Sequence, residues 1–449
     1  MLNLEHLKRI PWTLVLLFAC NIQAQSPDTA DRYSMHFQLT TITQQHSDFH
    51  APYEGPRSLR QNEYAATSVT ATLFAGFHLA KHTEVYVNPE LAGGEGLSGA
   101  TGVAGFTNGE TFRVGNAKPI IIMARLFLRQ IIPLSDKMKW REEAANNLHV
   151  PVPEKYIAIH AGKLSLADYF DFNTYSHDPR DHFMNWSLMS AGAWDYAADV
   201  RGYTWGVVGE WVSPKWEARV ATALLPTEAN GAKLSWEYGK SYSWQAEGVR
   251  HWGKDDLAAL RFLVFYNHAP MGDYRQAVLH SPPDLLATRG PSRGNLGWSL
   301  NFEQPLGDRM GLFGRLSWNQ GKTETWCFTE IDRSLQYGWI WKGIGWGRPR
   351  DVFGVAMVHN GLSKDHRDFL AAGGSGFIVG DGKINYGIEN ILECYYKLSV
   401  FDGRFTFSPD YQLVVNPAYN KDRGPVHFFG FRFHTQWWAV GRDKRGRTS

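Results

Sequence analysis

The sequence predicts an all-β fold, a transmembrane antiparallel β-barrel of about sixteen strands with inward-folded long loops. Three observations predict this fold. Strand-like segments with alternating apolar and polar residues follow one another along the chain. No apolar run reaches the ~20 residues that a membrane-spanning helix needs. Short breaks between the segments alternate with long ones, which is typical of barrels with short turns at one end and long loops at the other.

The alternation is clearest in residues 120–130, IIIMARLFLRQ. One face of this segment carries Arg125 and Arg129, with Phe127 between them. The opposite face is predicted to be an unbroken apolar row of Ile120, Ile122, Ala124, Leu126 and Leu128. Arginines opposite such a row do not suit a core strand of a soluble protein. They suit a strand with lipid on one side and a polar lumen on the other.

The segment before it, residues 84–90, repeats the design. Val85 and Val87 share one face, and the other face consists of Glu84, Tyr86, Asn88 and Glu90. A glycine-rich excursion at residues 93–118 separates the two segments. If it folds into the lumen, its charged residues meet those of the strands. We therefore predict a constriction with five candidates: Glu90, Glu110, Arg113, Arg125 and Arg129. The alternative interpretation is a structural ion-pair ladder along the barrel wall.

Further candidate strands complete the wall. They are residues 33–45, 68–78, 155–163, 202–211, 216–224, 242–251, 257–267, 310–319, 335–346, 351–359, 385–396, 404–415 and 425–437. A spanning strand needs ~9–11 residues, so about sixteen strands with their connections account for the chain length, and barrels of that size enclose an aqueous channel.

Two of these strands add predictions about facing. In 310–319 and 425–437, Arg315, Arg432 and His434 fall on the polar face and are predicted to line the inner wall. The opposite faces, which include Leu312, Phe429, Phe431 and Phe433, are predicted to meet lipid. With Arg125 and Arg129, the inner residues would make the wall locally positive. The channel would then favour anions modestly at low salt, more so below about pH 6.

Composition agrees with a barrel but does not decide for it. Aromatic residues make up 14% of the chain, glycine is abundant at 44 residues, and the mean hydropathy is −0.34. Barrels carry aromatic girdles and a polar interior, yet a soluble all-β protein has much the same composition. The formal net charge of +2 gives no indication of a nucleic-acid partner.

Both ends of the chain are predicted to lie outside the barrel. Residues 1–24 have the pattern of a secretory signal peptide, with Lys8 and Arg9 before a short apolar region and cleavage after Ala24. A lipoprotein cleavage box ending at Cys20 is the alternative, and the bulky Phe18 disfavours it. The barrel is predicted at 25–438, and residues 439–449 form a basic C-terminal tail.

No catalytic, metal or other cofactor site is predicted. Cys327 and Cys394 have no metal-ligand spacing, and although they could form a disulfide, their segments look separate. Residues 177–182 place histidines and aspartates around Pro179, which favours a loop turn over a catalytic pair. The chain has neither a Gly-x-Ser-x-Gly nor a His-Glu-x-x-His motif.

Several long stretches resemble one family. They are EVYVNPEL (84–91), GLSGATGVAGFTNGE (96–110), ARLFLRQ (124–130), residues 173–206, residues 265–277 and residues 407–436. In this order they resemble the carbohydrate-selective porins of the OprB family, from about Tyr33 to Trp437. One departure is that Trp437 and Trp438 are followed by AVGRDKRGRTS, whereas such barrels usually end on an aromatic residue of the last strand.

The resemblance implies a sixteen-stranded barrel in the outer membrane of a Gram-negative bacterium. It implies passive uptake of small sugars, glucose especially, through a pore narrowed by inward loops and lined with charged residues including arginines. Expected partners are sugars and outer-membrane lipid, with a homo-oligomer possible. One aromatic set lies in or beside the long loop at 166–200: Trp186, Trp194, Tyr196 and Tyr203. These residues either stack on sugars at the mouth of the pore, fold inward as a plug, or form an interface girdle.

Two other function classes compete with a passive sugar channel. One is a barrel-borne outer-membrane hydrolase, which would need a serine, histidine and amide or carboxylate constellation that the sequence does not show. The other is a secreted sugar-binding β-protein without a pore. Heat-modifiable gel migration and extraction only by detergent would separate a barrel from the second alternative.

Overall fold

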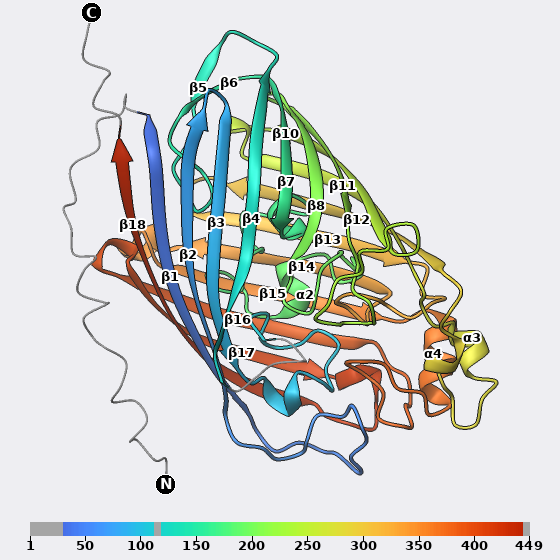
Figure 1. Cartoon of the computed structure of the whole chain (residues 1–449). Helices are drawn as coiled ribbons and strands as arrows, with labels where there is room; N and C mark the ends of the chain where they lie inside the picture. Colours follow the sequence, from blue (N-terminus) through green and yellow to red (C-terminus); the bar gives the residue numbers. More distant parts are fainter. Residues whose placement is uncertain (1–29, 112–117, 443–449) are drawn as a thin grey trace, which may run out of the picture.

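The computed structural model describes residues 30–111 and 118–442, and within them the wall is a closed antiparallel barrel of sixteen strands (Figure 1). The predicted fold class and strand number are confirmed. The predicted signal peptide lies outside the described residues. Among the residues that are described, no helix is long and apolar enough to cross a membrane.

The wall strands follow chain order around the barrel. They are β1 (Asp31–His46), β2 (Ala66–Ala80), β3 (Thr83–Gly94), β4 (Ile120–Pro133), β7 (Tyr156–Leu164), β8 (Thr204–Val212), β9 (Trp216–Ala223), β10 (Tyr242–Trp252), β11 (Ala258–Ala269), β12 (Arg293–Leu306), β13 (Met310–Asn319), β14 (Arg333–Lys342), β15 (Val352–Gly361), β16 (Glu389–Val400), β17 (Phe405–Val415) and β18 (Val426–Arg442). A separate hairpin joins β5 (Met138–Trp140) to β6 (Pro151–Pro153), and the helices are α2 (Trp186–Met189), α3 (Tyr274–Ala277) and α4 (Lys364–Ala371).

The barrel closes where the first strand meets the last. The pairing of β1 with β18 runs from Asp31 opposite Arg442 to His46 opposite Phe428. Residues 439–442 therefore continue the wall, four residues beyond the boundary expected at 438. Hydrogen bonding to β1 explains the extension, because an edge segment gains backbone partners by staying in the ladder.

Side chains alternate across the wall as predicted. On β18, Phe429 and Phe431 are 56% and 50% exposed on the outside, whereas Phe428 and Arg432 are buried on the inside. The other residues predicted to face outward share the outer face of their strands: Leu126, Leu128, Leu312 and Phe433. The outer surface is thus apolar and the inner surface polar, the arrangement that a barrel in lipid requires.

One strand departs from the predicted alternation. Across the step from Asn88 to Pro89 on β3, the partner on β4 changes from Arg125 to Met123, so Ala124 is an extra residue. Such a bulge shifts the alternation by one residue, and proline has no ladder N–H to donate at this point. Ile121 is consequently 76% exposed, and Ala124 is buried. The predicted apolar row is correct for Leu126 and Leu128 and wrong for Ile120, Ile122 and Ala124.

Leu126 offers a test of the outward face. It is 39% exposed near the middle of β4, so we expect Leu126→Arg to cost about 2–4 kcal/mol of folding free energy in lipid. Leu126→Ala is the control, because it shortens the side chain without adding charge. Folding of both variants into lipid vesicles, followed by urea titration, measures the difference. Equal stability of the arginine and alanine variants would contradict the assigned facing.

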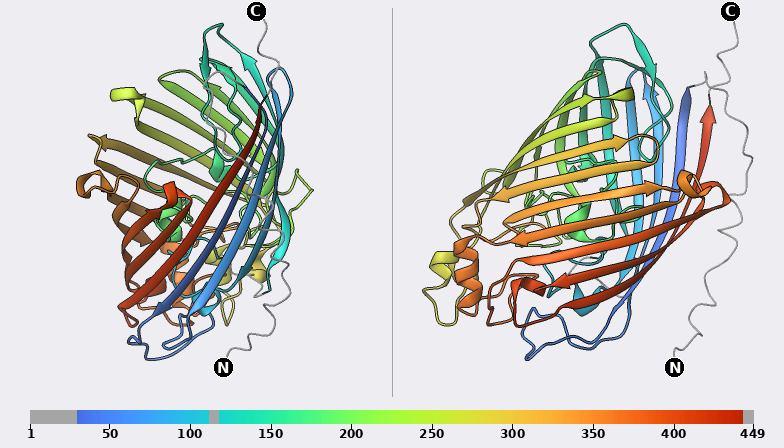
Figure 2. Two further views of the ribbon diagram at one scale, coloured as in Figure 1. Left: turned by 90° about the vertical axis from the view of Figure 1, so that its left-hand side faces the viewer. Right: turned by 180° about the vertical axis from the view of Figure 1, so that it is seen from behind.

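The two ends of the barrel differ. The β11–β12 and β15–β16 loops carry α3 and α4 at one end, and the β5–β6 hairpin projects from the other (Figures 1 and 2). That hairpin belongs to the β4–β7 connection (134–155), which lies at the end where the turns are otherwise short. Its stretch 141–150 folds into the lumen, where Leu148 and Val150 pack against Tyr86 and Phe127.

Two long loops enter from the opposite end. They are the β3–β4 loop (95–119, described to 111 and from 118) and the β7–β8 loop (165–203), whose α2 lies inside the barrel (Figure 1). Backbone N–H groups of the two loops donate hydrogen bonds to buried carboxylates on the inner wall. The bonds measure 2.5–3.0 Å and run from Met184 and Asn185 to Glu393, from Ala104 and Gly105 to Glu389, from Asp171 to Glu247 and from Thr174 to Glu303. These charge-assisted bonds seat both loops on the wall.

Candidate functional site

The inserted segments leave a cavity of 420 Å³ in the lumen. Its lining comes from β1 to β4, the β3–β4 and β7–β8 loops, the 141–150 stretch and the β13–β14 loop. Among the described residues, the lining includes four arginines and four carboxylates: Arg125, Arg129, Arg180, Arg201, Glu90, Glu110, Asp168 and Asp178. The cavity therefore presents positively charged hydrogen-bond donors and negatively charged acceptors between the barrel wall and the inserted segments.

Arg180, in the β7–β8 loop, lies at the centre of this charge cluster. Its Nε donates to Glu110 at 2.7 Å, and its Nη2 donates to Glu90 at 2.9 Å. Its Nη1 donates to Thr72 Oγ1 at 3.2 Å. One guanidinium thus joins both inward loops to β2 and β3. Burial raises the pKa of the Glu110 carboxyl, and the charge of Arg180 opposes that rise.

Arg125 is fixed by a second loop carboxylate. Its Nε and Nη2 donate to the two oxygens of Asp168 at 2.6 and 2.7 Å, a bidentate pair. Its guanidinium lies 5.2 Å from the ring centre of Tyr203 and 5.9 Å from that of Phe74. The Tyr203 hydroxyl in turn donates to Glu90 at 2.9 Å. These contacts hold Arg125 in one orientation at the edge of the cavity.

Arg129 holds the segment that enters from the short-turn end. It donates to Glu84 at 3.1 Å, to the Asn147 side chain at 3.0 Å and to the Asn146 carbonyl at 3.1 Å. Arg141 pairs with the other oxygen of Glu84. The cavity is therefore bounded by chain segments that come from both ends of the barrel.

The aromatic residues of the β7–β8 loop face inward. Trp186 and Tyr196 stack on either side of Phe328, with ring centres 4.7 and 4.4 Å apart. Exposure is 9% or less for all four residues of the predicted set: Trp186, Trp194, Tyr196 and Tyr203. The interface-girdle interpretation is wrong for them, because the loop that carries them is folded into the lumen.

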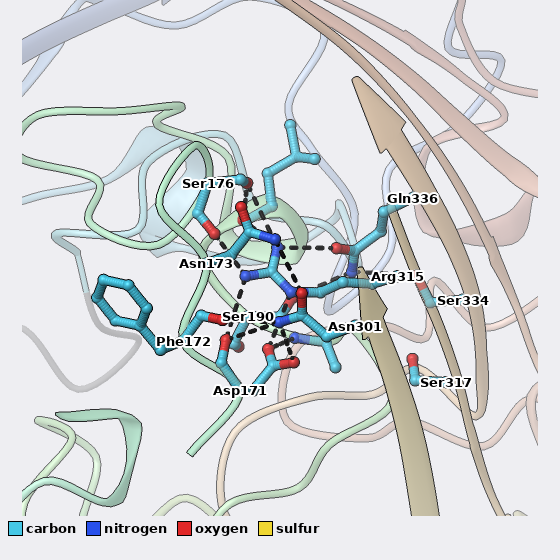
Figure 3. Close-up of polar contacts among 12 residues, drawn as sticks. Asp171, Phe172, Asn173, Ser176, Ser190, Asn301, Arg315, Ser317, Ser334 and Gln336 are labelled. Carbon is cyan, nitrogen blue, oxygen red and sulfur yellow. Dashed lines mark hydrogen bonds and ion pairs between the residues drawn. The ribbon is translucent and has the colours of Figure 1, made fainter. Parts of the chain in front are cut away.

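Arg315 lies on the inner face of β13, beneath the β7–β8 loop. Its side chain is fully buried, with Nε 3.0 Å from a carboxylate oxygen of Asp171. It also donates to the carbonyls of Ser176 and Leu188 at 2.5 and 3.1 Å (Figure 3). Arg315 therefore anchors the loop, and its charge is neutralised there rather than presented to the open lumen.

Arg432 and His434 are likewise covered. Arg432 donates to the carbonyls of Pro179 and His182 at 2.7 and 2.6 Å, and His434 is 2.8 Å from Thr40 Oγ1. Both lie on the inner face of β18, as their alternation predicts. The locally positive wall and the anion preference do not follow, because both side chains are buried and Arg432 is bonded to carbonyls of the loop.

Four of the five predicted constriction residues line the same cavity: Glu90, Glu110, Arg125 and Arg129. Arg113 lies outside the described residues. Sequence reasoning missed Arg180 and Asp168, the loop partners of these side chains. The available signal was indirect. Inward carboxylates such as Glu90 and Glu110 need a counter-charge, but the sequence around Arg180 by itself favours only a loop turn.

No metal chemistry is indicated in the described part of the chain. Within it, no group of three or more histidine, cysteine, aspartate or glutamate side chains is arranged to hold an ion. Cys327 is buried in the β13–β14 loop and Cys394 lies on β16, and both are free thiols.

Comparison with known proteins decides the family. The model of the family described as carbohydrate-selective porin, OprB family, matches residues 57–437. The chain belongs to the OprB family. As a member of this family it is an outer-membrane barrel of a Gram-negative bacterium. The poreless secreted protein is therefore a wrong alternative, and a family described as porins gives no support to the hydrolase.

Two curated relatives are porins. Porin AaxA of Chlamydia abortus is 29% identical over 283 residues, which are 62% of this chain and 54% of that protein. Porin AaxA of Chlamydia caviae is 30% identical over 136 residues, which are 30% of this chain and 26% of that protein. This chain thus spans about half, or less, of the length of these curated relatives.

The fold is similar to that of Pseudomonas putida OprB in its high-pH structure. The TM-score is 0.66 at 16% identity, and the match covers 90% of this chain and 94% of that one. The outer-membrane channel DcaP of Acinetobacter baumannii gives a TM-score of 0.52 at 8% identity, over 93% of this chain and 100% of that one. At these identities the likeness supports the barrel fold.

Proposed function

We propose that this OprB-family barrel lets small, uncharged sugars diffuse passively across the outer membrane through the cavity around Arg180. The observation that carries the proposal is the charge balance of the constriction. Of the described residues that line it, four are arginines and four are carboxylates. The closest contacts among them are the Arg125–Asp168 and Arg180–Glu90–Glu110 pairs, at 2.6–2.9 Å.

This balance suits a neutral polar solute. A permeating ion meets opposite charges that already neutralise one another, so it gains little from entering and loses its hydration. A sugar carries hydroxyls that donate and accept, and it exchanges its hydrogen bonds to water for bonds to fixed guanidinium and carboxylate groups. Opposite charges fix each other's geometry without attracting ions of one sign.

The proposed partners are small molecules and lipid. Small sugars are the proposed solutes, and outer-membrane lipid is proposed to cover the exposed leucines and phenylalanines of the outer face. Assembly into a homo-oligomer is tested by chemical crosslinking in native membranes.

Swelling of vesicles that contain the purified protein tests the proposed function. Glucose should enter faster than gluconate and glucosamine, which have similar size but carry one negative or one positive charge. In planar bilayers, glucose should also reduce the KCl conductance in a saturable way. Entry of gluconate or glucosamine at the rate of glucose, or the absence of a saturable glucose block, would each contradict a sugar-selective pore.

A further inference from the structure

Phe172 is the unusual aromatic residue of the cavity. It lies in the β7–β8 loop, lines the cavity and is 44% exposed. Every other aromatic ring of phenylalanine, tyrosine or tryptophan among the described lining residues is at most 9% exposed. An apolar ring held in a wet lumen costs free energy, because its surface stays in contact with water. Because the ring lines the cavity, a solute inside the cavity can reach its exposed surface.

The backbone that precedes Phe172 is strained and firmly held. Asp171 has φ of +56°, a left-handed conformation that costs free energy for a residue with a side chain. Its N–H donates to Glu247 at 2.7 Å, and its carboxylate accepts from the Ala191 N–H at 2.7 Å. The same carboxylate pairs with the buried Arg315 (Figure 3).

The backbone that follows is held as well. The Phe172 carbonyl accepts from the Asn301 side chain at 3.1 Å, and the Asn173 side chain donates to Asn301 Oδ1 at 2.8 Å. The N–H of Thr174 donates to Glu303 at 2.6 Å. In Figure 3 the Phe172 ring points away from this polar cluster. Strands β10, β12 and β13 therefore clamp the chain on both sides of Phe172, while the residue itself stays 44% exposed.

The ring is also backed by charge. The Arg261 guanidinium lies over it at 5.7 Å from the ring centre, and Arg261 is fixed by Glu303 at 2.7 Å. His177 lies at 5.0 Å, tilted by 53°. A cation over an aromatic face is attracted to it, so these neighbours hold the ring in one orientation without covering it. The side chain is thus rigid, flat and accessible from the cavity.

We propose that Phe172 is a stacking platform for the apolar face of a pyranose ring, and that it makes the channel prefer cyclic sugars to linear polyols. This inference rests on the proposed function and specifies its substrate class. A pyranose presents C–H groups on its faces and hydroxyls around its rim. The C–H face would pack on Phe172, and the rim hydroxyls would meet the fixed charges of the same cavity. A linear polyol offers the hydroxyls but no flat apolar face.

The test compares glucose with sorbitol as blockers of KCl current through wild type, Phe172→Ala, Phe172→Leu and Phe172→Trp in planar bilayers. We expect Phe172→Ala to raise the half-blocking concentration of glucose about fivefold, which corresponds to about 1 kcal/mol, and to leave that of sorbitol unchanged. Phe172→Leu should resemble alanine because it lacks a flat face, and Phe172→Trp should keep the preference for glucose. Because the ring is exposed, all three variants should fold, which heat-modifiable gel migration checks.

Phe401→Ala is the matched control. Phe401 is 75% exposed but lies in the β16–β17 turn, outside the cavity. Its replacement by alanine should therefore leave the half-blocking concentrations of glucose and sorbitol unchanged. If the ratio of the half-blocking concentrations of glucose and sorbitol is the same in Phe172→Ala as in wild type, the proposed stacking role of Phe172 is wrong, while the proposed sugar pore is unaffected. Absence of a saturable glucose block in wild type overturns the proposed function itself.

Discussion

Replacing Arg180 with alanine is expected to make the channel cation-selective and to raise its conductance. Arg180 is the shared partner of Glu90 and Glu110, and the three side chains are only 12%, 5% and 9% exposed. Without the guanidinium, the constriction gains a net negative charge and loses the group that joins both loops to the wall. Removing one member of a buried charge pair also costs about 3–5 kcal/mol of stability.

This selectivity should depend on pH in a defined direction. Burial already raises the pKa of Glu110, and Arg180 opposes the rise. In the variant the pKa of Glu110 rises further, so this carboxyl is protonated at low pH and charged at high pH. A group whose folded-state pKa is raised stabilises the fold below its unfolded pKa, and that contribution is lost as pH rises. Cation selectivity should therefore be stronger, and stability lower, at pH 8 than at pH 5.

Reversal potentials in a KCl gradient at the two pH values measure the effect. Arg180→Lys is the control, because it keeps the charge but cannot bridge two carboxylates with a planar fork. It should stay close to wild type in ion selectivity while losing part of the stability. If Arg180→Ala has the same reversal potential as wild type at pH 8, then Arg180 does not set the charge balance of the pore.

Arg315→Ala is expected to release the β7–β8 loop from the wall. The Arg315 and Asp171 side chains are 0% and 1% exposed, so the variant leaves an uncompensated carboxylate in the interior at a cost of about 3–5 kcal/mol. The barrel itself should still close, because its strand ladder does not involve this side chain. We expect a wider, noisier conductance and loss of the proposed glucose preference, since the loop carries Phe172 and Arg180.

Limited trypsin digestion of the folded protein in detergent reports on the loop. Cleavage after Arg180 or Arg201 should be faster in Arg315→Ala than in wild type. Asp171→Asn is the companion variant, because asparagine also tolerates the left-handed backbone. The double variant Asp171→Asn/Arg315→Ala lacks the unpaired Asp171 carboxylate. Its stability in urea titration should therefore be higher than that of Arg315→Ala alone. Wild-type digestion and conductance in Arg315→Ala would show that the ion pair does not hold the loop.

Most of the wall was predictable because the side-chain period of a strand is a local property of the sequence. The alternation around Arg432 in β18 required only neighbouring residues to be compared. No strand is predicted for residues 293–306, yet β12 forms there, and the signal was present in Leu296, Trp298 and Leu300, which alternate with polar or small residues. The bulge opposite Pro89 was not predictable in detail, because it depends on the register between two strands.

The site was predictable to the extent that strands position it. Glu90, Arg125 and Arg129 were placed by alternation alone. Arg180 and Asp168 reach the same cavity through a loop of nearly forty residues, and no local pattern indicates where such a loop folds. The same holds for Phe172, whose exposure results from contacts with β10, β12 and β13 that are far away in sequence.

The way the loops are seated has a consequence for how this pore can change its substrates. Glu247, Glu303, Glu389 and Glu393 hold the loops through backbone N–H groups. Any residue except proline supplies such a donor, so loop side chains that point into the cavity can be exchanged without loss of these anchors. Substitutions of uncharged loop side chains at the pore surface, such as Phe172, are then largely uncoupled from the stability of the wall, unlike those of the paired Arg180. A barrel of this kind can acquire a new solute preference by single mutations while it remains folded.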